Sequence, residues 1–97
     1  MRASEILIAI RRSISRGEYD LTVHAVEEMT GDDLDVYDIE NAVLTGVLVN
    51  EQTDDPRGTR YTIAGFASDR KTRVEVVGRF KETGVFLVIT VYAITVM

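Results

Sequence analysis

The sequence predicts an α+β domain in which two to three N-terminal helices pack on a four-stranded antiparallel β-meander. In the first half of the chain, apolar residues recur every three or four positions, as on the buried side of a helix. In the second half, runs of β-branched and aromatic residues alternate with short turn sequences. The longest run, residues 85–92, is typical of a strand buried on both faces, and the connections are short enough for antiparallel hairpins.

Length and composition limit the classes of function. The 97 residues predict one domain, 1–97, made of an N-terminal helix (1–18) and an α+β core (19–94). With no cysteine and one histidine, we expect no disulfide, no metal site and no cofactor. The net charge of −5 argues against DNA binding. No segment has the length of a membrane span and no secretory signal is evident, so we expect a cytoplasmic protein without membrane contact.

Three helices are expected before the strands. They cover residues 4–16, 21–29 and 35–46. Ser4, Thr22 and Asp35 are the expected N-terminal caps of these helices, because their side-chain oxygens accept hydrogen bonds from the first free backbone N–H groups. The helical spacing then predicts a set of core residues: Ile6, Ile10, Ile14, Val26, Met29, Val36, Ile39, Ala42 and Val43.

Four strands are expected in the second half, over residues 47–53, 59–67, 72–80 and 85–94. The turn between the first two contains Pro56 and Gly58. Proline fixes its own φ, and glycine tolerates the positive φ that other residues resist, so we expect Gly58 to have a positive φ.

The charged residues are unevenly distributed along the chain. Residues 24–55 contain ten acidic residues and no lysine or arginine, whereas residues 56–81 contain seven basic residues and two acidic ones. The acidic half coincides with the helices and the basic half with the strands. Two interpretations remain open: two solvated surfaces that attract each other, or a basic sheet surface for an anionic ligand.

The turn at residues 68–71 predicts which side chains share a face of the sheet. If Ser68 lies opposite Lys71, four cross-strand pairs follow: Phe66 with Arg73, Ala64 with Glu75, Thr62 with Val77, and Arg60 with Arg79. Continuing through the next turn places four residues of the last strand towards the core: Val85, Leu87, Ile89 and Val91. The alternate residues then join the arginines on the other face: Phe86, Val88, Thr90 and Tyr92.

That second face is the candidate functional surface. Like charges directly opposite each other on a sheet are unfavourable, so Arg60 and Arg79 need a compensating acid or a bound anion. Either internal pairing with the acidic half or a phosphate or carboxylate site would supply it, since arginine presents a planar fork of donors. Phe66, Phe86 and Val88 are too apolar for open solvent. A homodimer contact or a helix across this face would explain them.

His24 is the other residue with candidate chemistry, because it is the only side chain that ordinarily titrates near neutral pH. Glu27 and Glu28 lie three and four positions further along its helix. Either an ion pair on the helix surface or a general base beside a substrate fits this arrangement. The acidic residues near position 35 do not have the spacing of a calcium loop.

Several motifs of the chain resemble a widespread family of small prokaryotic domains of unknown function. The family's pattern is His-Ala-x-x-Arg-Met on a helix, a short helix ending in glycine, an Asp-Asp-Pro-x-Gly-x-Arg-Tyr turn and a final Thr-Val-Tyr strand. The matching residues here are His24-Ala25, Met29, Gly46, Asp54 to Tyr61 and Thr90-Val91-Tyr92. Glu28 stands where the family's helix usually has arginine, which weakens a role for the helix motif in anion binding or catalysis.

The order of helices before a meander also resembles the RelE/ParE and BrnT toxins of toxin–antitoxin pairs. This resemblance implies RNA binding or mRNA cleavage through Arg60, Tyr61 and Tyr92, to which the predicted register adds Arg73 and Arg79. Catalytic candidates are Arg60, Arg79, Tyr92 and His24, and whether the protein is an enzyme is left open.

Those toxins are usually basic, whereas this chain is acidic, which argues against RNA as a partner. The alternative function is a non-catalytic interaction module. Its partner would be a second copy of the chain or an antitoxin-like protein.

Overall fold

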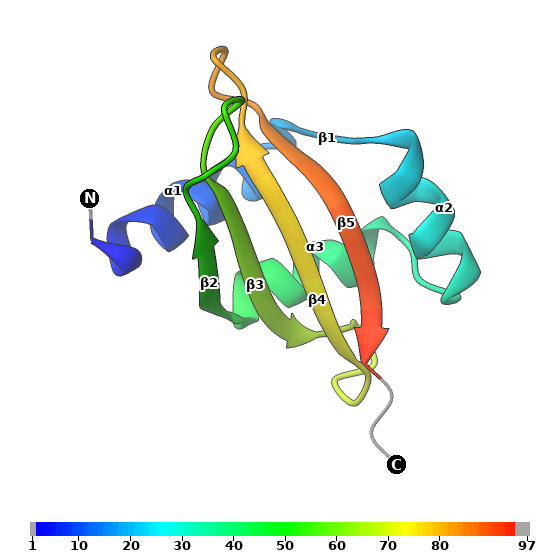
Figure 1. Cartoon of the computed structure of the whole chain (residues 1–97). Coiled ribbons are helices and arrows are strands. Elements are labelled where there is room, and N and C mark those ends of the chain that lie inside the picture. Colours follow the sequence, from blue (N-terminus) through cyan, green and yellow to red (C-terminus); the bar gives the residue numbers. More distant parts are fainter. Residues whose placement is uncertain (1, 95–97) are drawn as a thin grey trace.

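Helices and strands form two layers in the computed structural model, which describes residues 2–94 (Figure 1). The helices are α1 (Ala3–Ser15), α2 (Val23–Gly31) and α3 (Val36–Thr45). The strands are β1 (Tyr19–Leu21), β2 (Val47–Gln52), β3 (Arg60–Phe66), β4 (Arg73–Phe80) and β5 (Phe86–Ile94). Figure 1 shows α1 and α3 behind the sheet and α2 beside β5. The α+β prediction is confirmed, and among the described residues no helix has the length and hydrophobicity to span a bilayer.

The sheet has five strands in the order β1-β5-β4-β3-β2, so the prediction of four antiparallel strands is wrong in one respect. The meander of β2 to β5 is antiparallel as predicted, but β1 adds a parallel partner to β5. Three residues are too few to show the alternation of a strand in the sequence. The sequence prediction therefore placed Tyr19 and Asp20 in a loop and Leu21 at the start of the second helix. The backbone N–H of Thr22 extends the pairing by donating to Val88 O at 3.0 Å.

The helix caps agree with the sequence at two of three positions. The Thr22 side chain accepts from Ala25 N at 3.0 Å, and Asp35 accepts from the backbone of α3. The Asp38 carboxylate in turn accepts from Asp35 N, so the two residues form a capping box. The expected cap Ser4 lies inside α1, which begins after Arg2 without a side-chain cap.

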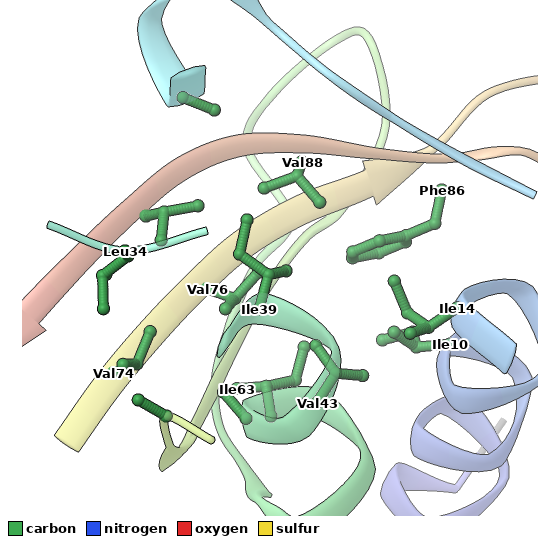
Figure 2. Packing of buried hydrophobic residues seen from close by; sticks show 14 of the residues in the cluster. Ile10, Ile14, Leu34, Ile39, Val43, Ile63, Val74, Val76, Phe86 and Val88 are labelled. Atoms are coloured by element: carbon green, nitrogen blue, oxygen red, sulfur yellow. The ribbon is translucent and has the colours of Figure 1, made fainter. Parts of the chain in front are cut away.

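The core lies between the helices and the inner face of the sheet (Figure 2). Figure 2 shows Ile10 and Ile14 of α1 facing Phe86 of β5, and Ile39 and Val43 of α3 lying over β3 and β4. The helical core predictions hold for α1 and α3, except that Val36 is only half-buried. In α2 the buried residue is Ala25, whereas the predicted Val26 is exposed and Met29 is half-buried.

The predicted register of β3 and β4 is confirmed for three of its four pairs, and the fourth, Arg60 with Arg79, is not among the observed pairs. Phe66 pairs with Arg73, Ala64 with Glu75 and Thr62 with Val77. The observed pairing continues to Tyr61 and Gly78, one residue before Arg60.

The predicted faces of β5 are wrong for its first half. Val77 of β4 pairs with Thr90 of β5, but the next residue, Gly78, pairs with Val88. The register therefore shifts at this point, and Ile89 is an extra residue in β5. A single extra residue reverses which face the preceding side chains occupy. Phe86 and Val88 are therefore fully buried in the core, rather than beside the arginines.

Gly78 makes the space for Phe86. A Cβ atom on Gly78 would lie 2.5 Å from two carbons of the Phe86 ring. The ring also packs edge-on against Phe80, with 5.2 Å between the centroids. The bulge in β5 and the glycine in β4 together bring this aromatic side chain into the core.

Candidate functional site

One face of the sheet carries no helix in the part of the chain that the structure describes, and we call it the open face (Figure 1). Strand alternation and the observed pairs define its residues. They are Val47, Val49, Asn50, Gln52, Arg60, Thr62, Ala64, Phe66, Arg73, Glu75, Val77, Arg79, Leu87, Thr90, Tyr92 and Ile94. All three arginines that the sequence predicted on one face are among them.

The open face differs in charge from the rest of the chain. It carries Arg60, Arg73, Arg79 and one acid, Glu75, which gives a net charge of +2. The whole chain carries −5, so the remaining residues carry −7. The separation of charge predicted from the sequence therefore has a counterpart in space.

Arg60 and Arg79 lie at the end of the sheet next to the 54–59 loop. Asp55, whose side chain is 5% exposed, pairs with Arg57 at 3.1 Å and with Arg60 Nε at 3.6 Å. The hydrogen bond from Arg57 holds the pKa of Asp55 below its ordinary value. Arg79 Nη1 donates to the Arg57 carbonyl at 3.5 Å. The loop thus supplies a hydrogen-bond acceptor for Arg79 and a nearby carboxylate for Arg60.

Those contacts leave Arg60 incompletely bonded. Its Nε is buried and has no hydrogen-bond partner among the described residues, because 3.6 Å to Asp55 is too long for a hydrogen bond. Arg60 is therefore paired with Asp55 by charge, but its Nε donor is left without a hydrogen bond.

Arg73 and Tyr92 lie at the opposite end of the open face. Arg79 lies six positions after Arg73 along β4, which corresponds to about 20 Å in a strand. The Tyr92 hydroxyl donates to Glu75 at 2.6 Å, and this bond together with burial raises the pKa of Tyr92 to about 12. Tyr92 therefore stays protonated at neutral pH and is occupied by Glu75. The predicted arginine and tyrosine residues share a face without forming one catalytic cluster.

Tyr61 and His24 lie away from the open face. Tyr61 points to the helix side, where its ring packs edge-on against Phe80 at 6.4 Å between centroids. His24 lies on α2 with its side chain 66% exposed, and its Nε2 is 3.1 Å from Glu28 Oε1. The structure thus gives His24 a helix-surface partner and does not place it beside Arg60 or Arg79. The described residues contain no cluster of acids and histidine that could hold a metal ion.

A hollow of about 330 Å³ opens on this face where β2 meets β3. Its wall includes Val47, Val49 and Phe66, which are 59%, 52% and 43% exposed. Arg73 stands at its rim, and the backbone of Gly65 contributes to the lining. Val47 and Val49 were absent from the predicted site, although their alternation along a short strand was a usable signal.

The sequence matches a protein family over residues 21–93, and the family is described as a domain of unknown function, DUF4258. The chain belongs to this family. No curated protein and no solved structure is significantly similar to it. The resemblance to the RelE/ParE and BrnT toxins therefore remains a prediction.

The DUF4258 segment includes the complete open face apart from Ile94, whereas α1 precedes it. Its first helix, α2, is held along the outer edge of β5 by polar contacts. Glu28 Oε1 accepts from Val91 N at 3.2 Å, and Asp32 Oδ2 accepts from Ala93 N at 2.8 Å. The two carboxylates satisfy donors that β1 does not reach. Glu28 thus has a structural role in this chain, where the sequence motif suggested an arginine.

Proposed function

We propose that this DUF4258 domain is a protein-interaction module that binds an acidic, apolar segment of another protein on its open face. The observation that supports the proposal most is the combination of exposed valine and phenylalanine side chains with net positive charge. Neither property alone selects a partner, but together they favour one that supplies both apolar area and carboxylates.

The apolar part of the surface lies at one corner of the open face. Val47, Val49 and Phe66 surround the hollow, and Val77 and Leu87 are half-buried further along the face. Aromatic side chains in such a setting commonly contribute most to the affinity of an interface. Phe66 is therefore the expected anchor for the bound segment.

The charges favour an acidic protein segment over a second copy of the same face. Two open faces stacked on each other would each bring a charge of +2 to the contact, which costs energy wherever arginines meet. Among residues 2–94, neither Arg73 nor Arg79 forms an ion pair, so both guanidinium groups are available to carboxylates of a partner.

The proposal can be tested by selecting random peptides displayed on phage against the immobilised protein. Enriched peptides should combine acidic and apolar residues. They should bind Phe66→Asp and Arg73→Glu at least about tenfold more weakly, which corresponds to about 1.4 kcal/mol. Val26→Asp is the matched control, because Val26 is 41% exposed on α2 and lies outside the open face.

Three results would contradict this function. One is the absence of any enriched peptide, and another is enrichment of peptides that bind all three variants equally. The third is a stable dimer in sedimentation analysis that Phe66→Asp converts to a monomer, since a second copy would then occupy the face. Urea unfolding of each variant establishes that it is folded before binding is compared.

RNA binding, as in a toxin-like domain, is a second candidate that the same arginines favour. An RNA ligand would draw on Arg60, Arg73 and Arg79, and its affinity would fall steeply with salt. Phe66 is the exposed aromatic ring on this face, so the surface offers few aromatic side chains on which RNA bases could stack. Growth arrest on induced expression, together with RNA binding at low salt that Arg79→Gln weakens, would favour this candidate over the peptide.

A further inference from the structure

We infer that the bound segment is an extended strand that pairs with the free edge of β2. This inference rests on the proposed function and specifies how the partner binds. It follows from the different treatment of the two edges of the sheet and from the space around β2.

The edge formed by β5 is closed by the chain itself. β1 pairs with the start of the strand, Thr22 bonds to the carbonyls of Val88 and Ile89, and α2 carboxylates take the N–H groups of Val91 and Ala93. These contacts satisfy the named backbone groups of β5, and the terminal strand on this side, β1, has only three residues.

The edge formed by β2 lacks such protection. β2 pairs with β3 alone, and five of its six residues are exposed. It contains neither proline nor lysine, which commonly guard a sheet edge against a further strand. Its edge-breaking features are a bulge between Leu48 and Asn50 and one charged side chain, Glu51, and they restrict additional pairing to a short segment.

The space beside this edge has the shape that an added strand needs. A second hollow of about 340 Å³ is lined by Ala3 of α1 and by Leu48 to Glu51 of β2. Figure 1 shows the N-terminal half of α1 extending past β2, beyond the limit of the sheet. A strand paired with β2 would therefore have α1 on its inner side and the Phe66 corner of the open face on its outer side. Val49 contributes to both hollows.

The occupant is a segment of another protein, because the edge is too small to hold a second copy stably. Six residues of strand extend about 20 Å. One added strand of that length covers only part of the roughly 1,000 Å² that a stable dimer interface needs. Strand addition of a peptide, in contrast, draws its affinity from main-chain hydrogen bonds and from pockets for alternate side chains.

Charge further specifies the sequence of the segment. Side chains on its outer side approach the positive open face, whereas those on its inner side approach Glu51, which pairs with Tyr61 and so faces the helices. The segment should therefore alternate with a period of two, with acidic or apolar residues outward and neutral or basic residues inward.

The experiment uses the peptides enriched on the wild-type protein. Each backbone amide of the strongest binder is methylated in turn, which removes one donor at a time. Strand pairing predicts that alternate positions lose at least about tenfold in affinity and that the positions between them tolerate the change. Amides of β2 should also become protected from hydrogen exchange.

Two protein variants test the placement. Ala3→Trp fills the inner hollow without changing the open face, and it should weaken binding at least about tenfold. Ile8→Trp is the control, because Ile8 is 55% exposed on the same helix and does not line that hollow.

The outcomes separate this inference from the proposed function. Peptides that depend on Phe66 and Arg73 but tolerate every amide methylation, or that bind Ala3→Trp normally, would overturn strand pairing and leave open-face binding intact. A wild-type dimer that Ala3→Trp dissociates would show that a second copy occupies the edge. Absence of enriched peptides would overturn both.

Discussion

Replacing Glu28 by alanine tests how α2 closes the β5 edge. Glu28 Oε1 accepts a bond from Val91 N at 3.2 Å, and Val91 is fully buried. A buried donor that loses its acceptor costs about 1–3 kcal/mol. Because the Glu28 side chain is 26% exposed and water can partly replace it, we expect the lower half of that range, about 1–2 kcal/mol. For a chain of this size, that loss lowers the melting temperature by about 4–16 °C.

The surface contact between His24 and Glu28, which is an ion pair only when His24 is protonated, contributes much less to this loss. His24 is 66% exposed, and an exposed pair of this spacing is worth about 0.3–0.5 kcal/mol. His24→Gln is therefore the matched control, since it removes the imidazole contact with Glu28 and keeps the bond to Val91. Glu28→Arg, which introduces the residue that the resemblance in the sequence predicts at this position, should destabilise at least as much as Glu28→Ala.

Urea unfolding at neutral pH gives the free energy of unfolding of each variant, and hydrogen exchange follows the amide of Val91. We expect a clearly lower urea midpoint and faster exchange at Val91 for Glu28→Ala and Glu28→Arg, and a much smaller change in both for His24→Gln. Equal midpoints for Glu28→Ala and His24→Gln, with unchanged exchange, would refute the role given to this carboxylate.

Three further predictions concern the fold. Gly58 has φ +132°, so Gly58→Val should destabilise by about 1–2 kcal/mol, and an unchanged urea midpoint would contradict the turn geometry. A Cβ on Gly65 would overlap the Ala42 carbonyl oxygen and lie 2.8 Å from the carbonyl carbon, so Gly65→Ala should cost about 1–3 kcal/mol by forcing α3 from β3. Because the Tyr92 pKa is raised to about 12, the native state keeps a proton that the unfolded chain releases near pH 10. Stability should therefore fall as the pH rises from about 10 to 12, and Tyr92→Phe should make that fall shallower.

Local patterns in the sequence were sufficient to predict most of the elements. Ile6, Ile10 and Ile14 of α1 recur at helical spacing and are buried. Thr22 caps α2 because its side chain reaches a nearby backbone N–H. Gly58 likewise follows from a turn whose geometry depends on its immediate neighbours. Each of these features is determined within a few residues of the chain.

Features that depend on tertiary contact were not predictable in this way. β1 is a strand only because β5 lies beside it, and three residues carry no period of their own. The bulge at Ile89 changes the face of Phe86 and Val88, and it accompanies the space that Gly78 leaves for the Phe86 ring. Alternation along the sequence cannot reveal an extra residue whose cause lies on the neighbouring strand.

The candidate site also contains residues that the sequence predicted correctly and residues that it did not. The arginines of β3 and β4 were correctly placed on one face, because a short hairpin determines the register between these strands. The apolar part of that face was assigned to Phe66, Phe86 and Val88. The structure keeps Phe66 there but replaces the other two by Val47 and Val49. The 20 Å or so between Arg73 and Arg79 along the strand also makes the face an extended surface, which suits a bound chain segment better than a compact catalytic centre.

The central claim is that the open face binds an acidic segment through Arg73 and its neighbours, and a charge-reversal cycle tests it most directly. Calorimetry would measure the affinity of wild type and Arg73→Glu for a selected peptide and for the same peptide with its critical acid changed to arginine. We predict that each single reversal weakens binding at least about tenfold and that the double reversal restores most of the loss. Additive losses in the double reversal, or an affinity that neither single change alters, would contradict the account.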